Sequence, residues 1–367
     1  MKHLQISKSF IVCVILIINC GLCTFICNGQ TARKYANEFL NIGVDAAAFG
    51  MANAVTASKK DVNSVYWNPA GLISLEDWEF GAMHANYFAN IATYDYVAAA
   101  KPLDDRSAIG FSIIRFGVDD ILNTTQLIDN QGNINFDRIS LFSTADYAFT
   151  VSYARKMPLQ GFTYGVNAKI IRRIIGDFAS AWGFGFDVGV QFKQGKWKFG
   201  AMARDITTTY NTWTIDENQF QTISDAVEGK NQEIPETTEI TLPKFEIGLA
   251  RTFDVRRFFH LTAAANLNMR FTQTNDLLST ESLSATPAIG FEADYIKLVY
   301  LRGGLGNFQE VQQLEGGSQV GFQPNFGVGF KYKGIQIDYA FTDIGDQSEA
   351  LYSNIFSLKV DFSFFRR

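Results

Sequence analysis

Side chains that could carry nucleophilic or metal chemistry are scarce in this sequence of 367 residues. All four cysteines lie within the first 27 positions, and beyond position 3 the only histidines are His84 and His260. A zinc site of Cys and His, a cysteine nucleophile and a disulfide framework therefore lack their residues. A serine nucleophile needs an activating base, and neither histidine lies in a recognisable Ser or Asp motif. We therefore expect a protein that is not an enzyme and that holds no metal and no cofactor.

Charged side chains are spread along the chain and form no catalytic cluster. Asp187, Glu246, Asp338 and His260 fall on the small or polar side of alternating segments. We expect all four to face the interior of the fold, where pairing with other charges is the plainer interpretation and a proton or ion path is the alternative. The acidic stretch 225–239 does not have the spacing of a calcium loop, which favours a solvated loop over a cation site.

Period-two alternation organises the chain after residue 29. In residues 182–192 every even position is large and apolar, and every odd position is small or polar. Five further segments, the last of them 356–364, repeat this pattern. Such alternation indicates β-strands with one apolar and one polar face. No apolar run after residue 29 approaches 18 residues, which excludes membrane-spanning helices.

Composition favours a membrane location for the apolar face. Aromatic residues make up 14% of the chain and charged residues 19%, which is below the roughly 25% usual for soluble chains. Strands of about 9–13 residues with an aromatic face and a small or polar face are typical of a transmembrane β-barrel rather than a soluble sandwich. In hydrocarbon such a sheet must close on itself. A net charge of −5 argues against a general nucleic-acid-binding surface.

Fourteen alternating segments can be counted between residues 77 and 367, an even number, as bacterial barrels usually have. The even-numbered connections are short, and most odd-numbered ones are longer, although the first and fifth are short. The longest run from about Val118 to Ser143 and from about Ile206 to Leu242. Short turns mark the periplasmic side of such barrels. We predict an all-β fold, a 14-stranded antiparallel transmembrane barrel with both chain ends on the periplasmic side.

The first 29 residues have the features of a secretory signal peptide. Lys2 and Lys8 precede an unbroken apolar run from Phe10 to Ile18, and small residues follow ahead of Gln30. The pattern predicts export and cleavage near residue 29, and therefore a location in the outer membrane. An uncleaved membrane anchor is the alternative, although the run is short for a spanning helix.

Residues 30–76 lack the alternation of the predicted wall and contain a small-residue stretch at 43–54. The inward face of the predicted strands is rich in glycine, and glycine in a strand often marks the close approach of another backbone. We therefore predict that residues 30–76 fold inside the barrel, or at its periplasmic mouth, as a hatch or plug. The alternative is that these glycines relieve crowding and assist bending of the sheet. They are Gly183, Gly185, Gly189, Gly248, Gly290, Gly327 and Gly329.

Three stretches of this segment carry a family resemblance: residues 38–44 (EFLNIGV), 48–54 (AFGMANA) and 62–72 (VNSVYWNPAGL). With them the chain resembles the PorV/PorQ-like family of Bacteroidetes outer-membrane proteins, within the FadL-like superfamily. The likeness covers about 35 residues at the level of sequence and the rest of the chain at the level of the fold. It implies a fourteen-stranded barrel with an N-terminal hatch whose turn is marked by Trp67, Asn68, Pro69, Ala70 and Gly71.

The resemblance implies a function in type IX protein secretion, by binding or handing over cargo or partner proteins at the outer membrane. Expected partners are then secretion components or the C-terminal domains of cargo, besides outer-membrane lipid. In FadL itself the hatch gates a path for long-chain fatty acids, so a transporter of a hydrophobic small molecule is the alternative. Such a transporter requires an apolar lumen pocket near Asn68 and a lateral opening of the wall, whereas a secretion adaptor can be sealed.

Overall fold

In the computed structural model, seventeen strands of the described part of the chain form one antiparallel sheet. The structure describes residues 36–87, 91–128, 131–216, 237–312, 317–342 and 353–365. The predicted signal peptide, residues 1–29, lies outside the described residues. None of the helices in the described part of the chain is long and apolar enough to cross a membrane.

Fourteen of the strands form the wall, and three are short additions to it. The wall strands are β1 (Glu79–Tyr87), β2 (Ala92–Asp104), β3 (Ser107–Asn123), β4 (Ser140–Lys156), β5 (Phe162–Ile175), β6 (Ala179–Gln194), β7 (Trp197–Arg204), β10 (Lys244–Arg256), β11 (Phe259–Arg270), β13 (Ser284–Tyr295), β14 (Val299–Gln312), β15 (Ser318–Tyr332), β16 (Ile335–Thr342) and β17 (Ser353–Asp361). The additions are β8 (Thr209–Ile215), β9 (Thr238–Thr241) and β12 (Leu278–Ser279), and two single helical turns lie outside the ring, η3 (Phe136–Arg138) and η4 (Phe362–Phe364).

The wall closes because each strand pairs with the next and the last pairs with the first. The pairing passes directly from β7 to β10 and from β11 to β13. It then returns from β17 to β1 over eight registered pairs, Glu79↔Asp361 to Asn86↔Asn354. The predicted closed barrel of fourteen antiparallel strands is therefore confirmed.

The predicted alternation decides which side chains face outward. On β6 the side chains of Trp182, Phe184 and Phe186 are exposed, and on β15 those of Phe326 and Phe330 are exposed as well. The residues between them point inward and are mostly small or polar. A closed ring with an apolar outer face pairs the backbone of its strands within the sheet, which is the arrangement that a bilayer requires.

Short turns and longer loops separate to the two ends of the ring. Between consecutive strands, residues 105–106, 157–161, 195–196, 257–258, 296–298 and 333–334 form one end, here called the short-turn end. The opposite end is the long-loop end. The C-terminal strand reaches the short-turn end, since Val360 pairs with Ile335 beside the turn at 333–334.

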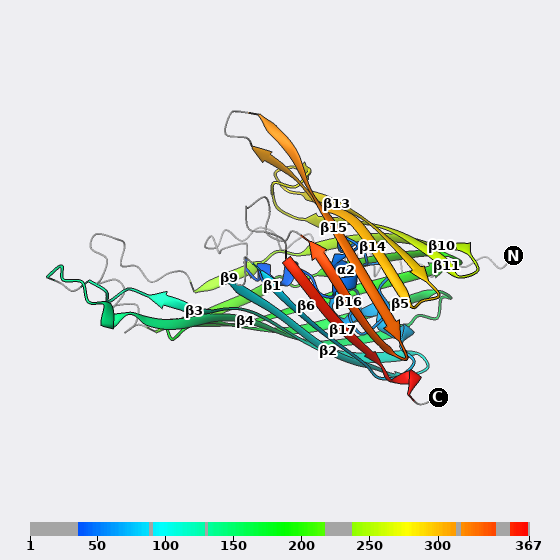
Figure 1. Ribbon diagram of the computed structural model, residues 1–367, viewed down its shortest axis with the longest axis horizontal. Coiled ribbons are helices and arrows are strands. Elements are labelled where there is room, and N and C mark those ends of the chain that lie inside the picture. The colour runs from blue at the N-terminus through cyan, green and yellow to red at the C-terminus, as the bar shows by residue number, and fades with distance from the viewer. Residues whose placement is uncertain are drawn as a thin grey trace, which may run out of the picture. The chain divides into compact units, whose positions relative to one another are not determined.

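Two of the expected long loops contain more strand than the sequence predicts. The connection expected to begin near Val118 begins at residue 124, because β3 and β4 continue as a hairpin past a register shift between Val118 and Ile121. This hairpin extends far to the left in Figure 1. The connection expected at 206–242 contains β8 and β9, and its residues 217–236 lie outside the described residues.

The hydrogen-bonded ladder of the wall is interrupted where β7 and β10 meet β8 and β9. The pairing of β7 with β10 ends at Arg204↔Lys244, and the pairing of β8 with β9 begins at Thr209↔Thr241. Between these pairs Asp205 and Thr208 have φ angles of 53° and 59°, a left-handed conformation that is uncommon for residues other than glycine. Residues 205–208 and 242–243 are therefore a local break in this pairing, here called the wall interruption.

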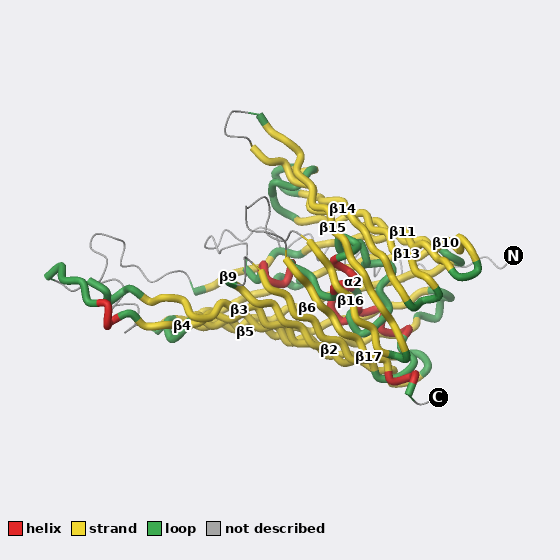
Figure 2. Tube along the Cα trace, in the orientation of Figure 1, coloured by secondary structure: helices red, strands yellow, loops and turns green. Residues whose placement is uncertain are grey.

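Four short helical turns precede the wall and lie against its inward side. They are η1 (Glu38–Asn41), α2 (Ala46–Phe49), α3 (Ser64–Trp67) and η2 (Pro69–Ser74). Contacts join α2 to β15, β16 and β17, whereas η2 contacts β2 to β6 on another side of the ring. Figure 2 shows these turns in red among the yellow strands. We call residues 36–76 the N-terminal segment.

Inward glycines of the wall make room for the N-terminal segment. A Cβ added to Gly290 would lie 2.5 Å from the carbonyl oxygen of Met51, and one added to Gly165 would lie 2.5 Å from the carbonyl carbon of Pro69. Of the seven glycines that the sequence singled out, Gly189, Gly248, Gly290 and Gly327 approach the segment in this way. The other three glycines make room for side chains of the wall, as the alternative interpretation of reduced crowding expects. They are Gly183, Gly185 and Gly329.

Candidate functional site

The carboxamide of Asn68 holds the turn of the N-terminal segment against the wall. This side chain is fully buried. Its amide nitrogen lies 3.1 Å from the carbonyl oxygen of Thr56 and donates to the wall carbonyls of Val190, at 3.1 Å, and Ala201, at 3.3 Å. Its Oδ1 accepts from the backbone N–H of Ala70 at 3.2 Å. One side chain therefore joins two parts of the segment to β6 and β7.

The residues beside Asn68 suit the same turn. Pro69 is the first residue of η2, a position where its missing N–H leaves no hydrogen bond unmade. Gly71 packs on the backbone of Lys59 so closely that any side chain would collide with it. The indole N–H of Trp67 donates to the carbonyl oxygen of Val44 at 3.0 Å. The structure thus brings all five residues of the expected hatch motif into one buried turn.

The four polar residues expected in the interior have different partners and do not form one cluster. Glu246 accepts from the guanidinium of Arg204 at 2.6 Å, and Arg204 in turn donates to the carbonyl oxygen of Tyr66 in the segment. The other three are Asp187, which is buried and pairs with Lys169 at 2.7 Å, Asp338, which pairs with Arg302 at 2.6 Å, and His260, which contacts Asp294 at 3.1 Å near the short-turn end.

The remaining histidine faces outward. On β1, His84 contacts Asp95 of β2 at 2.6 Å on the exposed side of the wall. Within the described ranges, no group of three or more His, Cys, Asp or Glu side chains could hold a metal ion.

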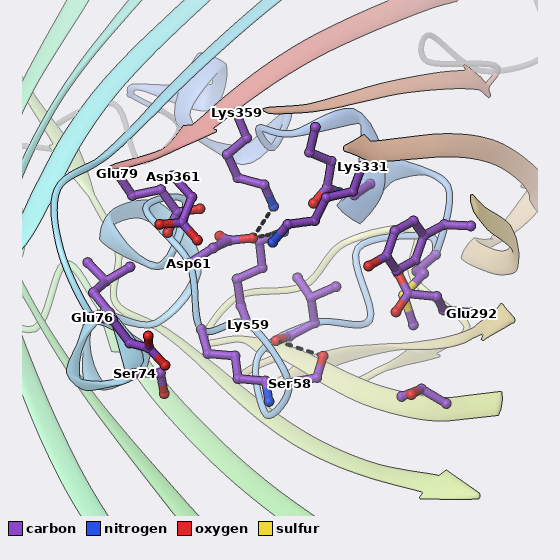
Figure 3. Close-up of a pocket in the computed structure, with 18 of the residues that line it drawn as sticks. Ser58, Lys59, Asp61, Ser74, Glu76, Glu79, Glu292, Lys331, Lys359 and Asp361 are labelled. Atoms are coloured by element: carbon purple, nitrogen blue, oxygen red, sulfur yellow. Dashed lines mark hydrogen bonds and ion pairs between the residues drawn. The ribbon is translucent and has the colours of Figure 1, made fainter. Parts of the chain in front are cut away.

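A charged cavity of about 390 Å³ lies at the short-turn end (Figure 3). Asp61 of the N-terminal segment pairs with Lys359 of β17 at 2.5 Å and with Lys59 at 3.3 Å. Lys59 also pairs with the buried Asp45. Figure 3 shows Lys59 and Lys359 pointing toward Asp61. We call these four side chains the ion-pair latch, because they tie the segment to the wall.

The latch stays charged across the neutral pH range. Burial alone would raise the pKa of Asp61, but the ammonium groups of Lys359 and Lys59 outweigh burial and hold that pKa below its usual 3.8. The pKa of Asp45 is lowered in the same way by Lys59. Burial would lower the pKa of Lys59, but Asp45 and Asp61 raise it above its usual 10.5.

The directions of these pKa shifts determine how the stability contributed by the latch depends on pH. The stability contributed by the two carboxylates is complete above about pH 4, and it is lost only as the pH falls through their lowered pKa values. The contribution of Lys59 is complete below about pH 10, and it is lost only as the pH rises through its raised pKa. The latch is therefore a structural attachment rather than a switch near neutral pH.

A second cavity at the short-turn end, of about 410 Å³, lies between the N-terminal segment and the β4–β5 turn. Gln191 lines this cavity and donates to the carbonyl oxygens of Thr56 and Lys59 at 3.1 and 3.0 Å. The cavity therefore lies near the Asn68 turn. The apolar side chains that line it are Ala57, Ile73, Met157, Leu159, Phe162 and Phe192, and four lysines complete the lining, Lys60, Lys156, Lys193 and Lys198. We call it the apolar cavity.

Residues 47–55 of the N-terminal segment separate the charged cavity from a third cavity at the long-loop end. Met51 lines the charged cavity, and Ala52 lines the third cavity, which measures about 270 Å³. A Cβ added to Gly304 of β14 would lie 2.5 Å from the carbonyl carbon of Met51 and 2.9 Å from the Cβ of Ala52. The segment therefore lies in direct contact with β14 between the two cavities.

The start of the N-terminal segment covers the inner side of the wall interruption. Asn37 and Asn211 of β8 exchange two side-chain hydrogen bonds, at 2.8 and 3.3 Å. Asn37 also donates to Thr241 of β9 at 2.9 Å, and Lys244 of β10 bonds Asn41. The break in the wall is therefore backed from inside by the segment.

The position of the latch, the apolar cavity and the wall interruption did not follow from the sequence. Asp61 and Lys359 are 298 residues apart, and no motif links them. Asp205 and Thr208 adopt a left-handed backbone without the glycine that would have marked it. The only local signal was the Asn68 turn itself, which lies near the apolar cavity.

Comparison with known proteins shows the fold. No family model and no curated protein matches the sequence. Among solved structures, the toluene transporter TodX of Pseudomonas putida is similar over 87% of this chain and 99% of its own, with a TM-score of 0.54 and 11% identity. The toluene transporter TbuX of Ralstonia pickettii and a FadL homologue of Pseudomonas aeruginosa each match 87% of this chain and 98% of their own, with TM-scores of 0.50 and identities of 11% and 12%. The chain therefore has a barrel of the FadL type.

Proposed function

We propose that this chain is an outer-membrane channel that passes a hydrophobic small molecule toward the periplasm. In this proposal residues 1–29 are a cleaved signal peptide, residues 30–76 are the hatch and residues 77–367 are the barrel. The observation that carries the proposal is the apolar cavity beside the Asn68 turn, because a transporter of this kind needs such a pocket near its hatch. The sequence also requires a lateral opening of the wall for such a transporter, and we propose that it forms at the interruption between β7 and β8 when the N-terminal segment moves away from its inner side.

Similarity to TodX and TbuX, both described as toluene transporters, supports a hydrophobic cargo. The lysines of the apolar cavity favour a molecule that also carries an anionic group, such as a long-chain fatty acid. Burial, and then the neighbouring charge of Lys193, lower the pKa of Lys60. An arriving carboxylate would stabilise the charged form of Lys60 and gain a charge-assisted hydrogen bond.

Filling the apolar cavity should block transport. Thr163 lines the cavity, whereas its neighbour Tyr164 does not. We expect Thr163→Trp to lower import of a radiolabelled long-chain fatty acid about tenfold, equivalent to the loss of about 1.4 kcal/mol of binding. Import is measured in cells of an export-competent host that lacks its own channel.

The matched control is Tyr164→Trp, which places the same indole on the outward face and should leave import unchanged. Equal import by wild type and Thr163→Trp would contradict the role of the cavity. Import of toluene, which is hydrophobic but carries no anionic group, distinguishes the channel itself from the anionic cargo. If toluene enters through the protein and the fatty acid does not, the channel stands and the anionic cargo is wrong.

A role in type IX protein secretion is the second candidate function. The β3–β4 hairpin favours it, because the hairpin and its loop expose large apolar side chains, and exposed apolar patches often mark protein contacts. They are Leu122, Ile128, Ile134, Phe136 and Leu141. A mild-detergent pull-down of the tagged protein, repeated with Ile134→Ser and Phe136→Ser combined, tests this role. Secretion components that are recovered with wild type and lost with the variant support it, whereas a co-purified lipid without such components contradicts it.

A further inference from the structure

The third cavity, at the long-loop end, has a lining unlike that of the apolar cavity. Carboxamide side chains dominate it, among them Asn53, Asn268, Asn307, Gln309 and Asn325. A carboxamide offers two N–H donors and a carbonyl acceptor within one planar group. Several of them around one small space match a ligand whose groups both donate and accept, as hydroxyl groups do.

Part of this lining is already fixed in place. Asn325 donates to the carbonyl oxygen of Gln323 at 3.0 Å and bonds the hydroxyl of Thr342. Gln309 donates to the side-chain oxygen of Asn307 at 2.8 Å. Such bonds hold the side chains in one orientation before any ligand arrives, which lowers the entropic cost of binding.

Two acceptors in the lining remain without a hydrogen bond among the described residues. They are Oδ2 of Asp276, a residue only 9% exposed, and Oδ1 of Asn53. The backbone N–H of Asp276 donates to Oγ1 of Thr274 at 3.2 Å, which holds the backbone of Asp276 in place. A buried acceptor without a donor is unfavourable, and a ligand that supplies O–H donors would satisfy both atoms.

Charge and size narrow the class of ligand. The lining holds one cation, Arg270, and one anion, Asp276, so it offers no net attraction to an ion. Its volume of about 270 Å³ lies just below the roughly 300 Å³ at which small-molecule pockets usually begin, which suits a single ring. Phe49, Pro287 and Ala288 add apolar surface to the lining, and the C–H face of a sugar ring needs such surface.

We propose that the cavity at the long-loop end binds one neutral sugar ring. Its hydroxyl groups donate to Asp276 and Asn53 and pair with the carboxamides, and its C–H face packs on the apolar side of the cavity. This site lies at the long-loop end and shares no lining residue with the apolar cavity at the short-turn end. The proposal therefore gives the barrel a second ligand, a sugar, besides the hydrophobic molecule of the proposed function.

Saturation-transfer NMR on the purified full-length protein tests this site. The protein is held in lauryldimethylamine oxide, a detergent without a sugar headgroup, and the probes are the methyl α-pyranosides of glucose, galactose and mannose. We expect saturable transfer to at least one of them. Asp276→Ala and Asn268→Ala should each weaken its binding about tenfold or more, whereas glucuronate and glucosamine, which carry a charge, should bind less well than the neutral probe.

Gln194→Ala is the matched control, because it removes an exposed carboxamide at the short-turn end. It should bind the probe as wild type does. Heat-dependent gel migration shows whether each variant has a folded barrel, and Asn268→Ala keeps the test valid if Asp276→Ala does not fold. The proposal is overturned if none of the three neutral probes gives saturable transfer, if both cavity variants bind like wild type, or if a charged probe binds best.

Discussion

Asn68→Asp releases the N-terminal segment from the wall while the ring of strands still assembles. The wild-type amide nitrogen, which carries two N–H donors, lies within 3.3 Å of three carbonyl oxygens. A carboxylate at the same place has no donor and would set a buried negative charge against those oxygens. We expect a loss of about 3 kcal/mol or more, the range found when a buried charge is left uncompensated. Asn68→Ala, which adds no charge, should cost less.

Trypsin provides the readout of this release. Lys59 is buried in the seated segment and should be cut in Asn68→Asp but not in wild type, as mass spectrometry of the fragments would show. Asn135→Asp is the control, because Oδ1 of Asn135 only accepts a hydrogen bond, from the N–H of Asp137, which a carboxylate can also do. If Asn68→Asp resists trypsin as wild type does, Asn68 does not hold the segment.

Gly304→Val should open the interior, whereas Gly303→Val, one position earlier on β14, should not. A Cβ at residue 304 would lie 2.5 Å from the carbonyl carbon of Met51, whereas one at residue 303 would meet nothing within 4 Å. Overpacking of this kind typically costs about 1–3 kcal/mol, and valine suits a strand, so the wall itself should tolerate it. The strain therefore falls on the contact with the segment.

Conductance of single proteins in planar bilayers measures the difference between the two glycine variants. We expect Gly304→Val to show frequent openings of large conductance, and wild type and Gly303→Val to stay nearly closed. Identical traces from both variants would mean that residues 47–55 do not seal the interior where the structure has them.

The wall was predictable because strand alternation is a local property. Trp182, Phe184 and Phe186 point outward as their spacing indicates, and the aromatic side chains of β15 do the same. The prediction of strand ends was less accurate where a bulge interrupts the alternation. Around Asp120, which has a φ of 58°, the register of β3 shifts and the strand continues into what the sequence indicated as loop.

The candidate site was predictable only at its turn. Asn68 and Pro69 form a local signal. Four of the seven inward glycines, among them Gly290 and Gly327, lie against the N-terminal segment, whereas the other three lie against side chains of the wall. The latch and the cavities depend on which residues meet across a closed ring, and register between distant strands has no local signature. Lys359 and Asp61, for example, become neighbours only after β17 pairs with β1 and the segment folds back inside.

The closed position of the N-terminal segment can be locked by a disulfide. All native cysteines lie in the first 27 residues, so a signal-cleaved chain has none. A Cβ on Gly306 would lie 3.2 Å from the Cβ of Ala52, close to the roughly 3.5–4.5 Å that a disulfide joins. Ala52→Cys combined with Gly306→Cys should therefore cross-link the segment to β14, as mass spectrometry would verify.

Fatty-acid import through this double-cysteine variant tests the central claim most directly, namely that a hydrophobic molecule passes the barrel only when the N-terminal segment moves. We predict that oxidation stops import, that dithiothreitol restores it, and that either single-cysteine variant is insensitive to both reagents. Import that continues at the same rate through the fully cross-linked protein would contradict the account.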